Sequence, residues 1–497
     1  MKNLKYIWLS VVALMSLGFV SCNDDDEYFD SKYQGQPISV NKVYLEDYES
    51  SVPDREVTFA RLGQLIRLEG SGFMGMKKVY VNGYDTYFNR AYVSDNSMLI
   101  TLNSKTPITD AEDDVRNTIR LVKDGTETVF DFIIRSASPS IIGIDNTLPL
   151  PGQAVKVFGS GLQEIVKVTL PGGVEITDGI VSDEDGEWYS FIMPSNLSQG
   201  GSIIAEGANG ISQTPAYFNE RRGMLLDFDG GGKQGAWSWK DNGSMIGFED
   251  RPDDDGNYTM RNDLVQDPLG FNGQVWQVVP DRLLNNENGG IQSGKTRVTE
   301  CWTVGDGDLD FENWARMSDL IPATTPLDEV AFQFDIYVPE ASPWASTGQI
   351  QICLVNNYQY KGIDSDELGA GKLTAFFIPW ASTGENVPFS TDGWITVTIP
   401  MSEFGKYKAL LEDAEATAPT FQTVIDDRLA ATYPNFGMGF VNSDYSFGDF
   451  SLASSLFNTK IYVDNWRIVP CKNFVISDYP EAVSYTHLRA HETGAYL

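Results

Sequence analysis

Aromatic residues embedded among polar and small residues are the groups in this 497-residue chain whose types and spacing suggest chemistry. Of the eleven tryptophans, all but Trp8 and Trp188 follow residue 220, and a single sandwich core does not need so many. Several are flanked by Asp, Asn, Ser, Thr and Gly, as loop residues are, and an aromatic ring exposed on a loop favours a ligand contact. We therefore predict ligand-binding side chains at Trp302, Trp314, Trp344, Tyr358, Tyr360 and Trp380, with Trp237, Trp239 and Trp394 in reserve.

A neutral polysaccharide suits such rings, because one face of a pyranose is made of C–H groups and its rim carries hydroxyls. Covering roughly 50 Å² of apolar sugar surface contributes only about 1 kcal/mol, so several rings must act together. Affinity at one site should be weak, on the order of micromolar to millimolar. Two other tryptophans, Trp276 and Trp466, lie inside apolar strands and are predicted core residues, and a core position is favoured for Trp188.

Catalytic chemistry has less support. The only histidines, His487 and His491, lie at the extreme C-terminus, so the rest of the chain holds no histidine-based triad or metal site. Glycoside hydrolysis needs two carboxylates about 5 to 9.5 Å apart. Asp335 with Glu300 or Asp306 is a candidate pair, but no sequence signature assigns an acid and a nucleophile. A glycoside hydrolase or lyase using paired carboxylates therefore stays open as an alternative.

The formal charge of −33 argues against nucleic acid as a partner. No cofactor is expected, and no metal site is assigned. The run Asp306, Asp308 and Asp310 begins like a calcium loop but lacks its glycine and closing glutamate. A structural calcium bound by Asp253 to Asp255 in another geometry stays open as an alternative.

The N-terminus has the pattern of an export signal. Lys2 and Lys5 precede an apolar run that is too short to span a bilayer, and Cys22 follows it. Residues 1–21 therefore resemble a bacterial lipoprotein signal peptide, with Cys22 as the lipidated residue and 22–37 as an acidic tether. The lipid is the only membrane attachment expected.

Two segments of the chain repeat each other. Gly63, Gln64, Gly70, Ser71, Gly72 and Val79 recur 89 positions later as Gly152, Gln153, Gly159, Ser160, Gly161 and Val168. Alternating apolar residues between these glycines predict half-buried strands. The repeat resembles the IPT/TIG immunoglobulin-like fold and implies two such domains, at 38–137 and 138–220.

The rest of the chain predicts a larger all-β domain. Apolar residues alternate with polar ones through 330–338, 349–354 and 394–399, so each strand should bury one face. We expect a jelly-roll-like β-sandwich over 221–476, with one helical stretch from Tyr407 to Ala431. Residues 477–497 resemble an adapter-derived, non-native tail.

Together these features resemble the surface glycan-binding lipoproteins of Bacteroidota polysaccharide-utilisation loci. The resemblance lies in the lipidated cysteine, the IPT/TIG repeats and C-terminal stretches such as Phe377 to Trp380, Asp392 to Pro400 and Tyr462 to Pro470. It implies a non-catalytic protein exposed on the cell surface at the outer membrane. Its partners would be a polysaccharide and a TonB-dependent outer-membrane transporter. A surface adhesin is a further alternative.

Overall fold

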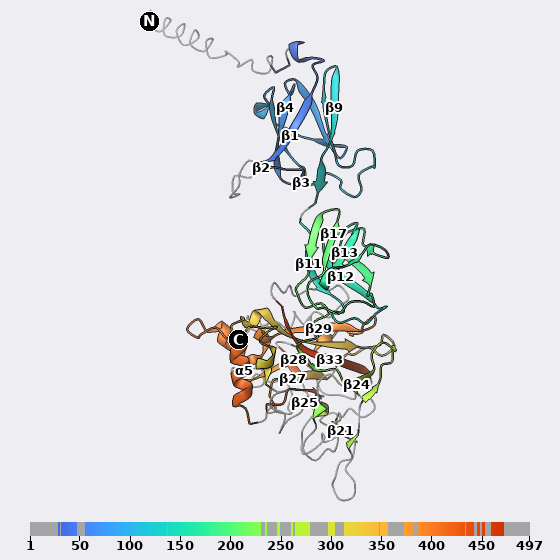
Figure 1. The fold of residues 1–497 in the computed structure, drawn as a ribbon, viewed down its shortest axis with the longest axis vertical. Helices are drawn as coiled ribbons and strands as arrows, with labels where there is room; N and C mark the ends of the chain where they lie inside the picture. Colours follow the sequence, from blue (N-terminus) through green and yellow to red (C-terminus); the bar gives the residue numbers. More distant parts are fainter. Residues whose placement is uncertain are drawn as a thin grey trace, which may run out of the picture. The chain divides into compact units, whose positions relative to one another are not determined.

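The structure is a computed structural model, shown in Figure 1. Two compact units make up the chain: unit 1 ends at Ser138 and includes Ala208–Gly210, and unit 2 comprises Pro139–Gly207 and the chain from Ile211 onward. The residues that the structure describes are 28–29, 31–46, 55–136, 138–229, 234–235, 246–248, 260–261, 264–278, 297–303, 313–346, 348–355, 372–381, 386–432, 434–441, 445–447, 450–452 and 459–471.

Unit 1 is an immunoglobulin-like sandwich. One sheet has the order β2-β1-β4-β7 and the other β6-β5-β8-β9, while β3 and β10 form a parallel pair. Alternate residues such as Ile66, Leu68 and Val79 are fully buried between the sheets. The strands are β1 (Ser39–Leu45), β2 (Arg55–Glu56), β3 (Phe59–Arg61), β4 (Leu65–Ser71), β5 (Met76–Val81), β6 (Tyr84–Thr86), β7 (Ser97–Thr101), β8 (Thr118–Lys123), β9 (Thr126–Asp131) and β10 (Ile133–Arg135).

The second immunoglobulin-like module has two four-stranded sheets, ordered β11-β12-β16-β15 and β14-β13-β17-β18. Val155, Val157 and Tyr189 are among its buried residues. Its strands are β11 (Ser140–Ile144), β12 (Ala154–Ser160), β13 (Lys167–Leu170), β14 (Val174–Ile176), β15 (Val181–Ser182), β16 (Trp188–Ile192), β17 (Ile204–Gly207) and β18 (Gly210–Gln213).

One pair of the repeated glycines, Gly70 and Gly159, is required for the same structural reason in both modules. A Cβ on Gly70 would lie 1.8 Å from the carbonyl oxygen of Ser39, and one on Gly159 would lie 1.9 Å from that of Ser140. Both glycines sit beside a shift in the register of the neighbouring strand pair. The carbonyl therefore approaches so closely that only a residue without a side chain fits.

The remainder of unit 2 is a two-sheet antiparallel sandwich. The six-stranded sheet has the order β23-β24-β33-β26-β29, with β19 also on β33, and the seven-stranded sheet has the order β22-β21-β25-β30-β27-β28, with β20 also on β25. The expected all-β fold with tandem immunoglobulin-like modules is confirmed. The strands are β19 (Met224–Leu226), β20 (Gln234–Gly235), β21 (Ile246–Phe248), β22 (Met260–Arg261), β23 (Leu264–Gln266), β24 (Gln274–Val278), β25 (Arg297–Thr303), β26 (Val330–Tyr337), β27 (Gln349–Cys353), β28 (Thr374–Phe377), β29 (Ile395–Pro400), β30 (Gly437–Val441) and β33 (Ile461–Pro470), besides the hairpin β31 (Tyr445–Phe447) and β32 (Phe450–Leu452).

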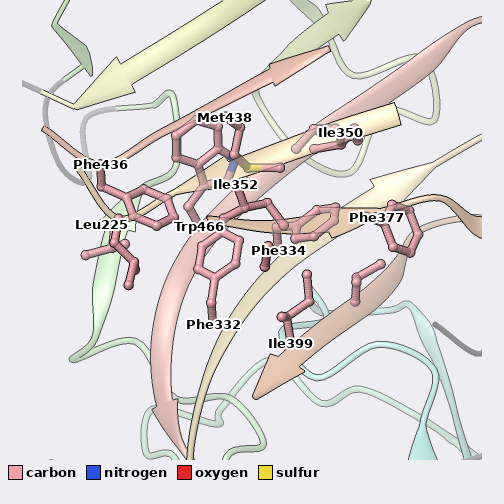
Figure 2. Close-up of a cluster of buried hydrophobic side chains, with 14 of the residues drawn as sticks. Leu225, Phe332, Phe334, Ile350, Ile352, Phe377, Ile399, Phe436, Met438 and Trp466 are labelled. Atoms are coloured by element: carbon pink, nitrogen blue, oxygen red, sulfur yellow. The ribbon is translucent and has the colours of Figure 1, made fainter. Parts of the chain in front are cut away.

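The two sheets enclose one apolar core. Figure 2 shows Phe332 and Phe334 of the six-stranded sheet with Ile352 and Met438 of the seven-stranded sheet, around Trp466. All five side chains are fully buried. The alternation read from the sequence thus correctly identifies the inward faces of these strands.

Two helices follow the sandwich strand β29: α4 (Gly405–Glu412) and α5 (Phe421–Ala430). Thr420 and Thr423 form a capping box at the start of α5, where the Thr420 backbone N–H donates to Thr423 Oγ1 over 3.1 Å. The single helical stretch expected from Tyr407 to Ala431 is therefore two helices. No helix among the described residues is both long enough and apolar enough to cross a bilayer.

The second immunoglobulin-like module packs on the outer face of the six-stranded sheet. Within unit 2, Ala331, Val469 and Cys471 join the apolar core of that module. Beside them, Thr147 of the module accepts a hydrogen bond from Arg467 over 2.8 Å and donates one to Gln333 over 3.1 Å. The junction expected near 219–223 thus lies inside one compact unit.

A buried ion pair lies at the centre of this interface. Arg467 of β33 is fully buried and pairs with Asp335 of β26 over 3.0 Å. Thr396 of β29 donates to the same carboxylate over 2.8 Å, and Asn465 donates to its second oxygen over 2.9 Å. The expectation that β26 buries only one face is therefore wrong, because its polar face is buried beneath the second module.

Candidate functional site

The structure places three predicted ligand contacts in the sandwich core. Trp314, Trp344 and Trp380 are at most 1% exposed. The expectation that they form exposed stacking surfaces is wrong, and their partners explain why. Arg428 of α5 lies 4.0 Å from the ring centroid of Trp314, Phe440 packs 5.6 Å from Trp344, and Trp380 donates its indole N–H to the Gly348 carbonyl over 2.8 Å.

Trp302 is also buried, but on the other side of the sheet. Cys301, its neighbour on β25, joins the sandwich core, whereas Trp302 packs with Cys353 on the outer face. Its ring lies over Gly437, where a Cβ would come within 2.1 Å of the indole. Trp302 is 2% exposed, so the predicted open stacking surface is wrong here too.

The burial predicted from the sequence is correct for some of the remaining described tryptophans and wrong for one. Trp276 and Trp466 are fully buried, as predicted, and the reserve residue Trp394 is 5% exposed with its N–H donating to Asp267 over 3.1 Å. Trp188 is only partly buried and lies beneath the ammonium of Lys156, so the predicted core position is wrong. Its neighbour Tyr189 holds that position instead.

Several predicted residues lie outside the described part of the chain. These are Tyr358, Tyr360, Trp237, Trp239, the lipidation residue Cys22, Asp306, the Asp253 to Asp255 cluster, and the C-terminal tail with His487 and His491.

A polar row on the outer face of the seven-stranded sheet is the arrangement that sequence reasoning missed. Gln349 and Gln351 of β27 and Thr374 of β28 are buried there, at 3%, 1% and 5% exposure. In register, Gln351 lies opposite Gly439 of β30. The alternation of Gln349 and Gln351 with Ile350 and Ile352 predicted that this strand buries one face only. That prediction is wrong, because every residue of β27 is buried.

One rung of this sheet connects the polar row to Trp302. Backbone pairing runs from Gly235 through Trp302, Gly437 and Cys353 to Thr374. Since Gly437 adds no side chain, the rung is lined by an indole, a thiol and a hydroxyl. Trp302, Cys353 and Thr374 are each at most 5% exposed, so this rung is packed rather than open to a ligand.

The candidate acid Asp335 has a structural role. It is 2% exposed and is held by Arg467 in the interface with the second module. Nearby Asp464 is 2% exposed, and burial together with the adjacent charge of Asp335 raises its pKa well above the ordinary value. Among the described residues, no group of three or more His, Cys, Asp or Glu side chains could hold a metal ion.

Known proteins place this architecture in a family. Residues 218–470, about half of the chain, match the family described as "Surface glycan-binding protein B xyloglucan binding domain". An "IPT/TIG domain-containing protein" of Bacteroides ovatus is 26% identical over 210 residues, which cover 40% of this chain and 41% of that relative. The match thus spans about two fifths of the relative's length.

One solved structure supports the fold. The surface glycan-binding protein PbSGBP-B of Prevotella bryantii aligns with a TM-score of 0.57 at 18% identity, covering 88% of this chain and 99% of that one. An SGBP-B from a complex xyloglucan utilization locus in Bacteroides uniformis aligns over 88% of this chain and all of its own at 15% identity, with a TM-score of 0.42. The resemblance predicted from the sequence is confirmed: this chain belongs to the surface glycan-binding protein B family, a family of non-catalytic glycan-binding proteins.

Proposed function

We propose that this protein captures xyloglucan, a neutral plant polysaccharide, on the outer side of its seven-stranded sheet. The observation that carries the proposal is the match of residues 218–470 to a family described by xyloglucan binding. A neutral ligand also suits a chain with a formal charge of −33, since an uncharged glycan is not repelled by it.

The packing of unit 2 favours this sheet over the other one. The second immunoglobulin-like module covers the outer face of the six-stranded sheet through Thr147, Gln333 and Arg467. A glycan chain therefore has no access to the middle of that face. On the seven-stranded sheet, the row of Gln349, Gln351 and Thr374 is at most 5% exposed, so we assign the glycan contacts to residues that follow this row along the chain rather than to the row itself.

Aromatic residues next to the rung are the proposed stacking groups. Trp237 follows Gly235 by two positions, and Gly235 pairs with Trp302 at one side of the rung. Tyr358 follows Cys353, which belongs to the same rung, by five positions. We propose Trp237, Trp239, Tyr358 and Tyr360 as the stacking groups because only a few residues of sequence separate each pair from this rung.

Binding measurements with xyloglucan test the proposal. If each ring contributes about 1 kcal/mol, the double variant Trp237→Ala/Trp239→Ala should bind about 30-fold more weakly, and so should Tyr358→Ala/Tyr360→Ala. Trp188→Ala is the matched control, because Trp188 lies in the second immunoglobulin-like module. Wild-type affinity in both double variants would refute the aromatic platform, and absence of xyloglucan binding by the wild-type chain would refute the function.

We further propose that the protein is anchored to the outer membrane through lipid on Cys22 and passes its glycan to a TonB-dependent transporter. The family description as a surface protein supports this location. Replacing the lipidated residue in Cys22→Ser should move the protein from the membrane fraction to the soluble fraction. Co-purification of a transporter with the wild-type chain, solubilised in mild detergent, tests the partner.

A further inference from the structure

The first immunoglobulin-like module carries a hollow that the proposed function does not use. It lies between the hairpin of β5 and β6 and the segment that follows, and has a volume of about 380 Å³. That size falls within the range typical of small-ligand sites. Its lining includes Lys78, Asp85, Tyr87, Phe88, Asn89 and Arg90.

An exposed aromatic ring stands beside this hollow. Tyr87 is 79% exposed, the largest value among the exposed large hydrophobic side chains of the described residues. An aromatic side chain in the interior loses most of its surface to neighbouring groups, whereas Tyr87 keeps its ring accessible. A flat accessible ring next to a hollow provides a surface on which a sugar ring can stack.

Polar groups around the ring are held in place by their neighbours. Lys78 forms an ion pair with Asp85 across the hairpin, and Lys77 pairs with Asp124 over 2.6 Å. Arg90 lies 4.5 Å from the ring centroid of Phe29. Both ion pairs are about half exposed, so their charged ends also face solvent, where a sugar hydroxyl can replace a bound water molecule.

The charge of the lining favours an uncharged ligand. Each lysine of the hollow has a carboxylate partner, so the lining has little net charge beyond Arg90. The whole chain carries −33, which opposes an anionic lipid surface. A polyhydroxylated neutral ligand matches an aromatic face surrounded by balanced charges.

We propose that this hollow is a second saccharide site, which takes one or two sugar rings of a neutral glycan with a ring stacked on Tyr87. The proposal rests on the proposed function, because it assigns a further contact for the same polysaccharide. A long glycan that reaches both sites gains affinity through effective concentration, even if the second contact is weak.

Hydrogen–deuterium exchange of the full chain with xyloglucan oligosaccharides, at short labelling times, tests the site. We expect slower exchange at residues 84–92 and, separately, in the sandwich. Tyr87→Ala should remove the first protection, leave the second unchanged, and weaken binding of long xyloglucan about 5-fold, as loss of about 1 kcal/mol predicts. Tyr92→Ala is the control, since Tyr92 is an exposed tyrosine of the same module that does not line the hollow.

The outcomes separate this proposal from the proposed function. Protection of the sandwich without protection of 84–92 overturns the second site alone. Absence of protection in both regions overturns both. Protection of 84–92 by vesicles of phosphatidylglycerol, and not by oligosaccharides, makes the surface a membrane contact and also overturns the saccharide site.

Discussion

Replacing Asp335 with alanine should destabilise the whole of unit 2, because it leaves Arg467 buried without its counter-charge. The two groups lie 3.0 Å apart, and Arg467 is fully buried. At an effective dielectric constant of 20, their attraction is about 5.5 kcal/mol, offset in part by desolvation. Breaking a buried pair by removing one partner typically costs about 3–5 kcal/mol, so we expect a loss of this size in the free energy of unfolding for Asp335→Ala.

Tryptophan fluorescence in urea measures this loss selectively. Apart from Trp8, all tryptophans of the sequence lie in unit 2, so the signal reports chiefly on that unit. The control is Asp335→Ala/Arg467→Met, which removes both charges and should recover much of the lost stability, since apolar replacement of a buried ion pair is often close to neutral. The coupling energy between the two sites should therefore exceed about 2 kcal/mol.

The interface also predicts how unit 2 unfolds. Since Thr147 of the second module and Arg467 of the sandwich share one hydrogen-bond network, the two parts should unfold in a single transition. A loss below about 1 kcal/mol for Asp335→Ala, or separate transitions for the module and the sandwich in the wild-type chain, would refute the reasoning.

Four further outcomes are expected. Burial raises the pKa of Asp145 from 3.8 to about 7, so its protonated form is favoured in the folded state. The unfolding free energy should therefore rise as the pH falls from about 7 toward 4, by up to about 4 kcal/mol; urea midpoints at pH 5 and pH 8 measure this, and an unchanged pH dependence in Asp145→Asn would contradict it. Gly159→Ala should cost about 1–3 kcal/mol, because its Cβ meets the Ser140 carbonyl at 1.9 Å, whereas the exposed control Ser160→Ala should change the urea midpoint little. Trp344→Ala should cost about 3–5 kcal/mol in urea unfolding, and weaker xyloglucan binding at unchanged stability would show instead that this ring serves the ligand. Cys22→Ser should lose membrane association in cell fractionation, and retention of the variant in the membrane fraction would argue against a lipid anchor.

The placement of the tryptophans shows where sequence reasoning reaches its limit. Trp314 and Trp344 have loop-type neighbours in the sequence, which correctly indicates irregular backbone but carries no information about burial. Their rings are covered by Arg428 and Phe440, residues about 100 positions away. Short-range composition cannot report contacts that form only when distant segments pack together.

The strand patterns show the same limit in another form. Gln333 and Asp335 on β26 alternate with apolar residues in the same way as Gln349 and Gln351 on β27, so both polar faces look like solvent faces in the sequence. In the structure, both faces are buried: the first is covered by the second immunoglobulin-like module, and the second lies on the outer face of the opposite sheet. Which polar face a module covers depends on the three-dimensional arrangement of the strands.

The sequence by itself determined the all-β fold, the tandem repeat and the family, because strand periodicity and close-approach glycines are local requirements that leave a readable pattern. The tertiary structure decided which aromatic rings fill the core and which sheet face the second module covers, because burial is a property of long-range packing. Arg467 illustrates the difference: nothing near it in the sequence identifies Asp335 and Thr147 as the partners that join the second module to the sandwich.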